Sequence, residues 1–138
     1  MKKPAKAELD IDLINEKLWD KRFGNSGETA VEAARNLSRG EKIKYPKGIA
    51  CAKLNIAAVN FYQSKNDIAF KYLNEAFKWF DNNRQEKGFI RALLIKGNIY
   101  ESFGDYEKTL NLWIEAFKAS RKINDLESEG EASSQLGL

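Results

Sequence analysis

The fold is decided by the stretch Leu93-Leu94-Ile95-Lys96-Gly97-Asn98-Ile99-Tyr100, together with Phe103-Gly104-Asp105-Tyr106 shortly after it. Leu93, Gly97 and Tyr100 recur at the three- and four-residue intervals of one helix face. Gly104 tolerates a positive φ angle, and Asp105 is a favourable N-cap for a new helix. The second helix carries an apolar stripe that we expect to face the core: Tyr106, Leu110, Trp113 and Phe117. The stretch therefore predicts two antiparallel helices joined by a tight turn.

The same pattern returns when the sequence is shifted by 40 residues. Glu75-Ala76-Phe77-Lys78 recurs unchanged as Glu115-Ala116-Phe117-Lys118, and small residues occupy Ala57, Gly97 and Gly137. A glycine inside a helix costs up to about 1 kcal/mol relative to alanine, so Gly97 indicates a close helix crossing. A repeat of this length is typical of stacked helical arrays. We place units at about residues 8–47, 48–87 and 88–127, with a partial fourth unit at 128–138 and a basic tail at 1–7.

The composition excludes most familiar active sites. The 138 residues include no histidine and one cysteine, which rules out Ser-His or Cys-His catalysis, Cys/His zinc sites and an internal disulfide. The glycines form neither a phosphate-binding loop nor a dinucleotide fingerprint. We therefore expect a protein that is not an enzyme and that uses no cofactor and no metal.

Charge and hydropathy restrict the partners further. Lysine and arginine number 23 against 20 acidic residues, and both signs are mixed along the same helices. A nucleic-acid binder gathers its cations on one face, so we expect no nucleic-acid partner. The basic N-terminus has no apolar run behind it, and no segment has the length and apolar character of a membrane span. These features predict a cytoplasmic protein with no membrane partner.

The third unit resembles the tetratricopeptide repeat in three successive patterns: Leu93-x-x-Lys96-Gly97-x-x-Tyr100, Gly104-Asp105-Tyr106 and Trp113-x-x-Ala116. The resemblance covers about residues 8–138 and is strongest in the third unit, whereas the second unit departs from the pattern at Lys53 and Asn60. The 40-residue unit is similar to longer versions found in bacterial signalling proteins. The resemblance implies an all-α solenoid of antiparallel helix pairs, with about seven helices in a right-handed superhelix.

In that family the first helix of each pair lines a concave groove that holds a peptide or a partner helix. The register implies these groove residues here: Cys51, Leu54, Ala58 and Phe61 from the second unit, and Arg91, Leu94, Asn98 and Glu101 from the third. Leu54 and Leu94 would form an apolar floor, while Arg91 and Asn98 would hydrogen-bond a peptide backbone or a carboxylate. The resemblance thus implies a non-catalytic module that binds a protein or peptide.

Two other functions stay open on the sequence. One is an N-terminal regulatory or sensory domain of a larger signalling protein, such as a histidine kinase, a nucleotide cyclase or a transcriptional regulator. The other is a structural scaffold that uses convex and end surfaces. Residues 126–138 predict a short last helix that docks through Ala132 and Leu136 and either continues into a longer protein or mediates self-association.

The remaining chemically interesting residues have structural interpretations. Cys51 is interpreted as a small packing residue, because no histidine is present to activate its thiol. The carboxylate groups are interpreted as solvated helix faces or helix starts: Glu28 and Glu32, and Glu127, Glu129 and Glu131. Trp79 and Trp113 fit helix-to-helix cores, and Trp19 either shields the end of the first unit or is partly exposed.

Overall fold

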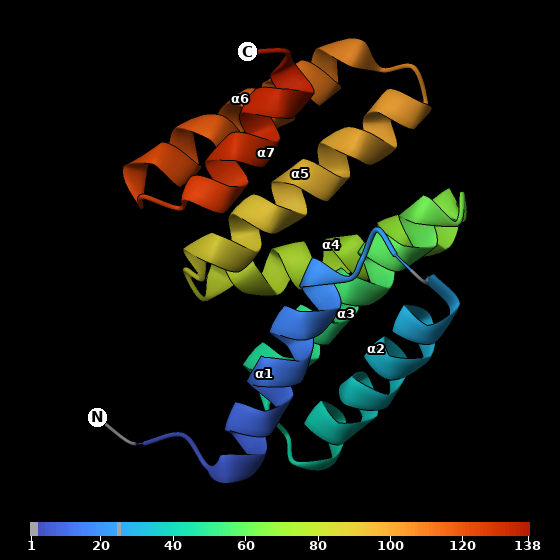
Figure 1. Ribbon diagram of the computed structural model, residues 1–138, viewed down its shortest axis with the longest axis vertical. Coiled ribbons are helices and arrows are strands. Elements are labelled where there is room, and N and C mark those ends of the chain that lie inside the picture. Colours follow the sequence, from blue (N-terminus) through green and yellow to red (C-terminus); the bar gives the residue numbers. More distant parts are fainter. Residues whose placement is uncertain (1–2, 25) are drawn as a thin grey trace. The chain divides into compact units, whose positions relative to one another are not determined.

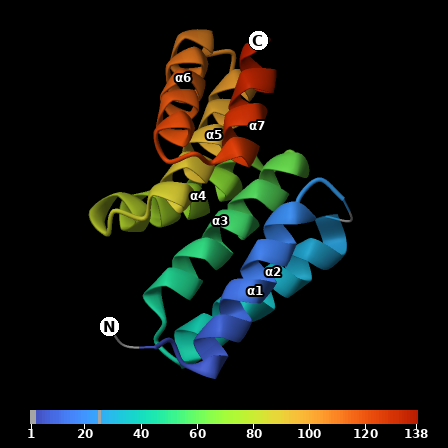
Figure 2. The same ribbon diagram turned by 60° about the vertical axis from the view of Figure 1, so that its left-hand side comes forward.

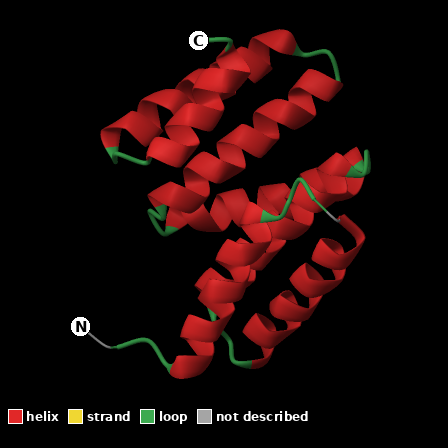
Figure 3. Ribbon diagram, viewed as in Figure 1, coloured by secondary structure: helices red, strands yellow, loops and turns green. Residues whose placement is uncertain are grey.

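The computed structural model describes residues 3–24 and 26–138. In these residues the chain forms seven α-helices and no strand (Figure 3). In chain order they are α1 (Lys6–Asp20), α2 (Ser26–Lys42), α3 (Pro46–Tyr62), α4 (Asn66–Asn82), α5 (Glu86–Ser102), α6 (Tyr106–Lys122) and α7 (Leu126–Leu136). The predicted all-α fold, with helices that pack against their neighbours in the chain, is confirmed.

The helices recur at a constant interval of 20 residues. Each helix from α2 to α6 has 17 residues, and each start lies 20 residues after the previous one, up to α7. The five turns between α2 and α7 are also equivalent, because one residue of each has a positive φ angle: Lys44, Ser64, Arg84, Gly104 and Asn124. Two such helices account for the 40-residue period of the sequence.

A Schellman motif closes each of these helices. After α3, for example, the Lys65 N–H donates to the Asn60 carbonyl at 2.9 Å, and the Ser64 N–H donates to the Phe61 carbonyl at 2.9 Å. The same two bonds satisfy the last carbonyls of the other helices that end in a left-handed residue. The chain therefore reverses after a fixed number of residues.

The helix starts agree with the sequence at Asp105. Its carboxylate accepts a hydrogen bond from the Lys108 N–H at 3.2 Å, and Gly104 before it has φ 80°. Asp125 caps α7 in the same way through the Ser128 N–H. The predicted turn at Gly104 and the predicted N-cap at Asp105 are thus both confirmed.

The first helices of the second and third pairs are buried on nearly every side. Six consecutive residues are buried in α3, from 54 to 59, and six in α5, from 90 to 95. Gly97 lies at a close crossing in α5, since a Cβ atom there would be 2.5 Å from Cδ1 of Trp113 on α6. The close crossing predicted for Gly97 is confirmed.

The second helix of each pair (α2, α4 and α6) buries one stripe of residues, many of them small, at positions that repeat every 40 residues. The buried residues are Thr29, Ala33, Asn36 and Gly40 in α2, Ala69, Leu73, Ala76 and Phe80 in α4, and Thr109, Trp113, Ala116 and Ser120 in α6. The stripe predicted for α6 is therefore wrong at Tyr106 and Leu110, which are exposed. Thr109 and Ser120 can be buried because their hydroxyls donate to the Asp105 and Phe117 carbonyls of the same helix turns.

The chain comprises two compact units, residues 1–76 and 77–138, with the boundary inside α4. In the first unit α1, α2 and α3 all contact one another, and Leu18, Ala33 and Ile56 form a core. In the second unit α6 and α7 pack on α5, and the core includes Leu94 and Trp113. The helices of each group lie side by side in both views (Figures 1 and 2).

Buried asparagine side chains join the helices of the first unit. Asn55 of α3 donates to the Asn15 carbonyl of α1 at 3.1 Å, and Asn15 in turn donates to the Gly48 carbonyl at 3.2 Å. Asn36 of α2 donates to the Ile11 carbonyl at 3.1 Å. Asn15 and Asn55 occupy the same repeat position, so a buried amide links consecutive first helices.

Candidate interaction surfaces

The four groove residues expected on α3 share one face of that helix in the first unit. Leu54 and Ala58 are fully buried, whereas Cys51 and Phe61 are half-buried. The accessible part of this face is thus contributed by the Cys51 thiol and the Phe61 ring. Beside them, Lys53 of α3 lies 3.8 Å from the Glu75 carboxylate of α4.

The four groove residues expected on α5 share one face in the second unit. Arg91, Leu94 and Asn98 are buried, and Glu101 is exposed. Leu94 belongs to the core that contains Trp113 and Ala132. On this face only Glu101, near the C-terminal end of α5, presents its side chain openly to a partner.

Phe61 adjoins an aromatic cluster at the ends of α1 and α3. Its ring lies 5.1 Å from that of Tyr62, and Tyr62 lies 5.0 Å from Phe23. The Arg22 guanidinium packs between Trp19, at 3.8 Å, and Phe23, at 4.2 Å. Trp19 is buried, so of its two possible roles the structure shows the shielding one.

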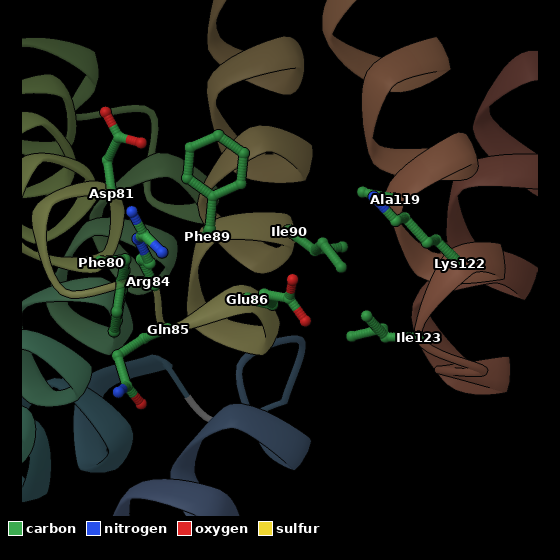
Figure 4. Close-up of a pocket in the computed structure, with 10 residues that line it drawn as sticks. All are labelled: Phe80, Asp81, Arg84, Gln85, Glu86, Phe89, Ile90, Ala119, Lys122 and Ile123. Carbon is green, nitrogen blue, oxygen red and sulfur yellow. The ribbon is translucent and has the colours of Figure 1, made fainter.

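A pocket of about 310 Å³ opens in the second unit between the α4–α5 turn and the C-terminal end of α6 (Figure 4). Phe89 and Ile90 project from α5 on one side, and Ala119, Lys122 and Ile123 form the opposite side. The α4–α5 turn and the helix ends beside it supply a polar edge: Asp81 of α4, Arg84 and Gln85 of the turn, and Glu86 of α5. Arg84 is positioned there by the left-handed conformation that closes α4.

The chemistry of this pocket suits binding. Its walls combine apolar carbons with charges of both signs, and it lacks a nucleophile paired with a base. An apolar side chain of a partner fits such a pocket, while rim groups of both signs can hydrogen-bond a backbone.

The sequence did not indicate this pocket. One wall comes from residues 80–90, and the opposite wall comes from residues 119–123, which lie about 40 positions later. The apolar Ile123, directly after the last residue of α6, was the available signal. Its place beside Ile90 depends on how α5 and α6 cross.

A polar group in the first unit connects α1 with the start of α3. The Tyr45 hydroxyl lies 2.9 Å from each carboxylate oxygen of Asp12 and donates to it, and Lys47 Nζ lies 4.0 Å from Asp12. Burial raises the pKa of Tyr45 above its ordinary value, and the hydrogen bond to Asp12 and the Asp12 charge raise it further. The phenol therefore remains a proton donor throughout the physiological range.

Of the carboxylates noted in the sequence, Glu28 and Glu127 are exposed, whereas Glu32, Glu129 and Glu131 are half-buried. Glu32 binds Arg35 at 2.7 Å, and Glu129 of α7 lies 3.4 Å from Arg121 of α6. Over residues 3–24 and 26–138, no cluster of three or more acidic or cysteine side chains is arranged to hold a metal ion. No helix in that part of the chain is long and apolar enough to cross a membrane.

Comparison with known proteins gives one informative likeness. No family model matches the sequence. The chain is 30% identical over 108 residues to Tetratricopeptide repeat protein 29 of Trypanosoma brucei brucei. The match covers 78% of this chain and 21% of that protein, so the chain spans about a fifth of its relative's length. The relative carries the name of the same repeat family that the residue spacing resembles.

Proposed function

We propose that the chain is a tetratricopeptide-like, non-catalytic module that binds a peptide or a partner helix. The observation that carries the proposal is the repeated helix pair, in which the second helices bury the same positions every 40 residues. The likeness to a tetratricopeptide repeat protein supports it independently. Stacked helix pairs of this kind present continuous faces whose side chains can bind an extended partner.

In each unit the proposed binding surface lies on the first helix, α3 in one and α5 in the other. On α3 the half-buried Cys51 and Phe61 would contact the partner, above the buried Leu54 and Ala58. On α5 the exposed Glu101 would contact it, with Arg91, Leu94 and Asn98 shaping the surface beneath. The pocket at Ile90 and Ile123 would provide an anchor for one apolar side chain in the second unit.

The single cysteine provides a direct test on the α3 face. A thiol-linked photocrosslinker is attached to Cys51 and irradiated in a lysate of the source organism. The control is a Cys51→Ser/Asn74→Cys variant, which carries the crosslinker on the exposed side of α4. We expect one protein to be captured from Cys51 and not from position 74. Equal capture from both positions would contradict the α3 face as the binding face.

The anchor pocket is tested with a matched pair of isoleucines. Ile123→Asp places a charge in the pocket, whereas Ile114→Asp places one at an exposed position of α6 outside it. We expect Ile123→Asp to weaken binding of the captured partner about tenfold or more, and Ile114→Asp to leave it unchanged. Unchanged affinity in both variants would remove the pocket from the binding surface.

A further inference from the structure

Two hollows follow one another along the outer side of the α1–α2 pair in the first unit. One, of about 600 Å³, lies between the start of α1 and the end of α2, and Leu13 and Ile43 line it. The other, of about 710 Å³, lies between the end of α1 and the start of α2, and Val31 lines it. They lie at opposite ends of the same helix pair, and together they are called the α1–α2 groove here.

Large apolar side chains remain exposed along this groove. Leu13 of α1, Val31 of α2 and Ile43 after it line the hollows and are each between 41% and 62% exposed. Leu9 of α1, which lines neither hollow, is 47% exposed. Four exposed apolar side chains on one helix pair are more than a solvated face requires, and apolar surface beside a hollow favours an interaction site.

The charges along the groove change sign from one end to the other. The first hollow is lined by the cations Lys17, Arg39 and Lys42 and by one acid, Asp10. The second is lined by three acids, Asp20, Glu28 and Glu32, and by the cations Lys21 and Arg35. The order is clearest on α2, where one side reads Glu28, Glu32, Arg35, Arg39 and Lys42.

A groove that is acidic at one end and basic at the other is complementary to itself when turned end over end. A two-fold axis near the middle of α2 would set Glu28 beside Lys42 of a second copy, and Glu32 beside its Arg39. Arg35, at the centre, already binds Glu32 of its own helix at 2.7 Å, which neutralises the charge near the axis. Ala34 and Ser38 are small and exposed, so the two α2 helices can approach closely.

We propose that this face binds a second copy of the chain, with the α1–α2 pairs antiparallel across a two-fold axis. The same patch serves both partners, as isologous dimers require. The acid-to-base order of α2 also suits the helix dipole, but the dipole does not explain the exposed leucines and the two hollows beside it. This inference is independent of the binding face proposed on α3 and α5.

The test uses sedimentation equilibrium of the full chain from about 1 µM to about 1 mM. Glu28→Lys/Glu32→Lys makes both ends basic, and Arg39→Glu/Lys42→Glu makes both ends acidic. We expect the wild type to dimerise and each double variant to dimerise about tenfold or more weakly. An equimolar mixture of the two double variants should form a heterodimer. The variant with all four substitutions should dimerise again, because its ends are exchanged.

Matched controls separate this interface from other ways of pairing. Leu126→Glu changes an exposed residue of α7 and should leave dimerisation unchanged. Circular dichroism of every variant shows that the helices are retained. A wild type that stays monomeric over the whole range, double variants that dimerise like wild type, or a loss of dimer in Leu126→Glu would each overturn the proposal. None of these results would alter the crosslinking and pocket tests, which use other surfaces.

Discussion

Gly97 and Gly130 are both helical, but their surroundings are opposite. A Cβ atom at Gly97 would collide with the buried Trp113 ring, whereas a Cβ atom at Gly130 would meet nothing within 4 Å. We expect Gly97→Ala to lower the free energy of unfolding by about 1 kcal/mol or more, because the crowding exceeds the gain in helix propensity. Gly130→Ala should raise it by about 0.5–1 kcal/mol. Urea denaturation measures both.

The two glycines serve as controls for each other. Since the substitution is the same, their opposite effects isolate the contact with Trp113 from the general preference of helices for alanine. Equal shifts in the two variants would show that α5 and α6 do not cross at Gly97.

Tyr45 gives the structure a predictable response to alkaline pH. Because burial and Asp12 raise its pKa, the folded chain keeps a proton that the unfolded chain releases above about pH 10. The Tyr45 contribution to stability is therefore complete below that pH and is lost as the pH rises toward the folded-state value. We expect urea denaturation from pH 9 to pH 11 to show a shallower loss of stability in Tyr45→Phe than in wild type.

Asp12→Asn provides the second arm of this measurement. It removes the carboxylate that accepts the phenol hydrogen bond, so the alkaline loss of stability should also become shallower. Parallel curves for wild type and Tyr45→Phe would contradict the assignment of this loss to Tyr45.

At the scale of the elements, the turns carry local strain at residues other than glycine. Ser64 has φ 62°, a left-handed conformation that costs about 1 kcal/mol for most residues and little for glycine. We expect Ser64→Gly to raise the midpoint of thermal unfolding. Ser38→Gly, in the exposed interior of α2, should lower it, because glycine there only loosens the helix. A destabilised Ser64→Gly would contradict the Schellman geometry at this turn.

The positions of the helices were largely predictable from the sequence, but the buried face of α6 was not. Repetition at 40 residues and the Gly104-Asp105 turn indicated the pairs, since both reflect local backbone preferences. The stripe on α6 was assigned to its large residues, and Tyr106 and Leu110 were wrong. Thr109 and Ser120 take the buried positions because close helix packing favours small side chains whose hydroxyls are satisfied within the helix.

The binding surfaces were less accessible to sequence reasoning than the helices. The groove positions on α3 and α5 followed from register with a known family and remain a proposal. The Ile123 pocket and the α1–α2 groove depend on helix crossings, which local patterns do not determine. The charge order along α2 is visible in the sequence, but the two hollows between α1 and α2 are not.

At the scale of the molecule, the chain is built by repetition of one helix–turn element. The asparagines at 15 and 55, the buried stripes of the second helices and the left-handed turn residues all recur at multiples of 20 residues. Each compact unit has its own core, with Leu18, Ala33 and Ile56 in one and Leu94 and Trp113 in the other.

Within each unit, the described contacts join helices that are neighbours or next neighbours along the chain. Every contact therefore closes only a short loop, and little chain entropy is lost before the contact forms. Topologies of this kind have low contact order and fold rapidly, because no distant segments must find each other. The regular 20-residue spacing thus favours rapid folding, because a newly made helix pair can pack as soon as its own residues are available.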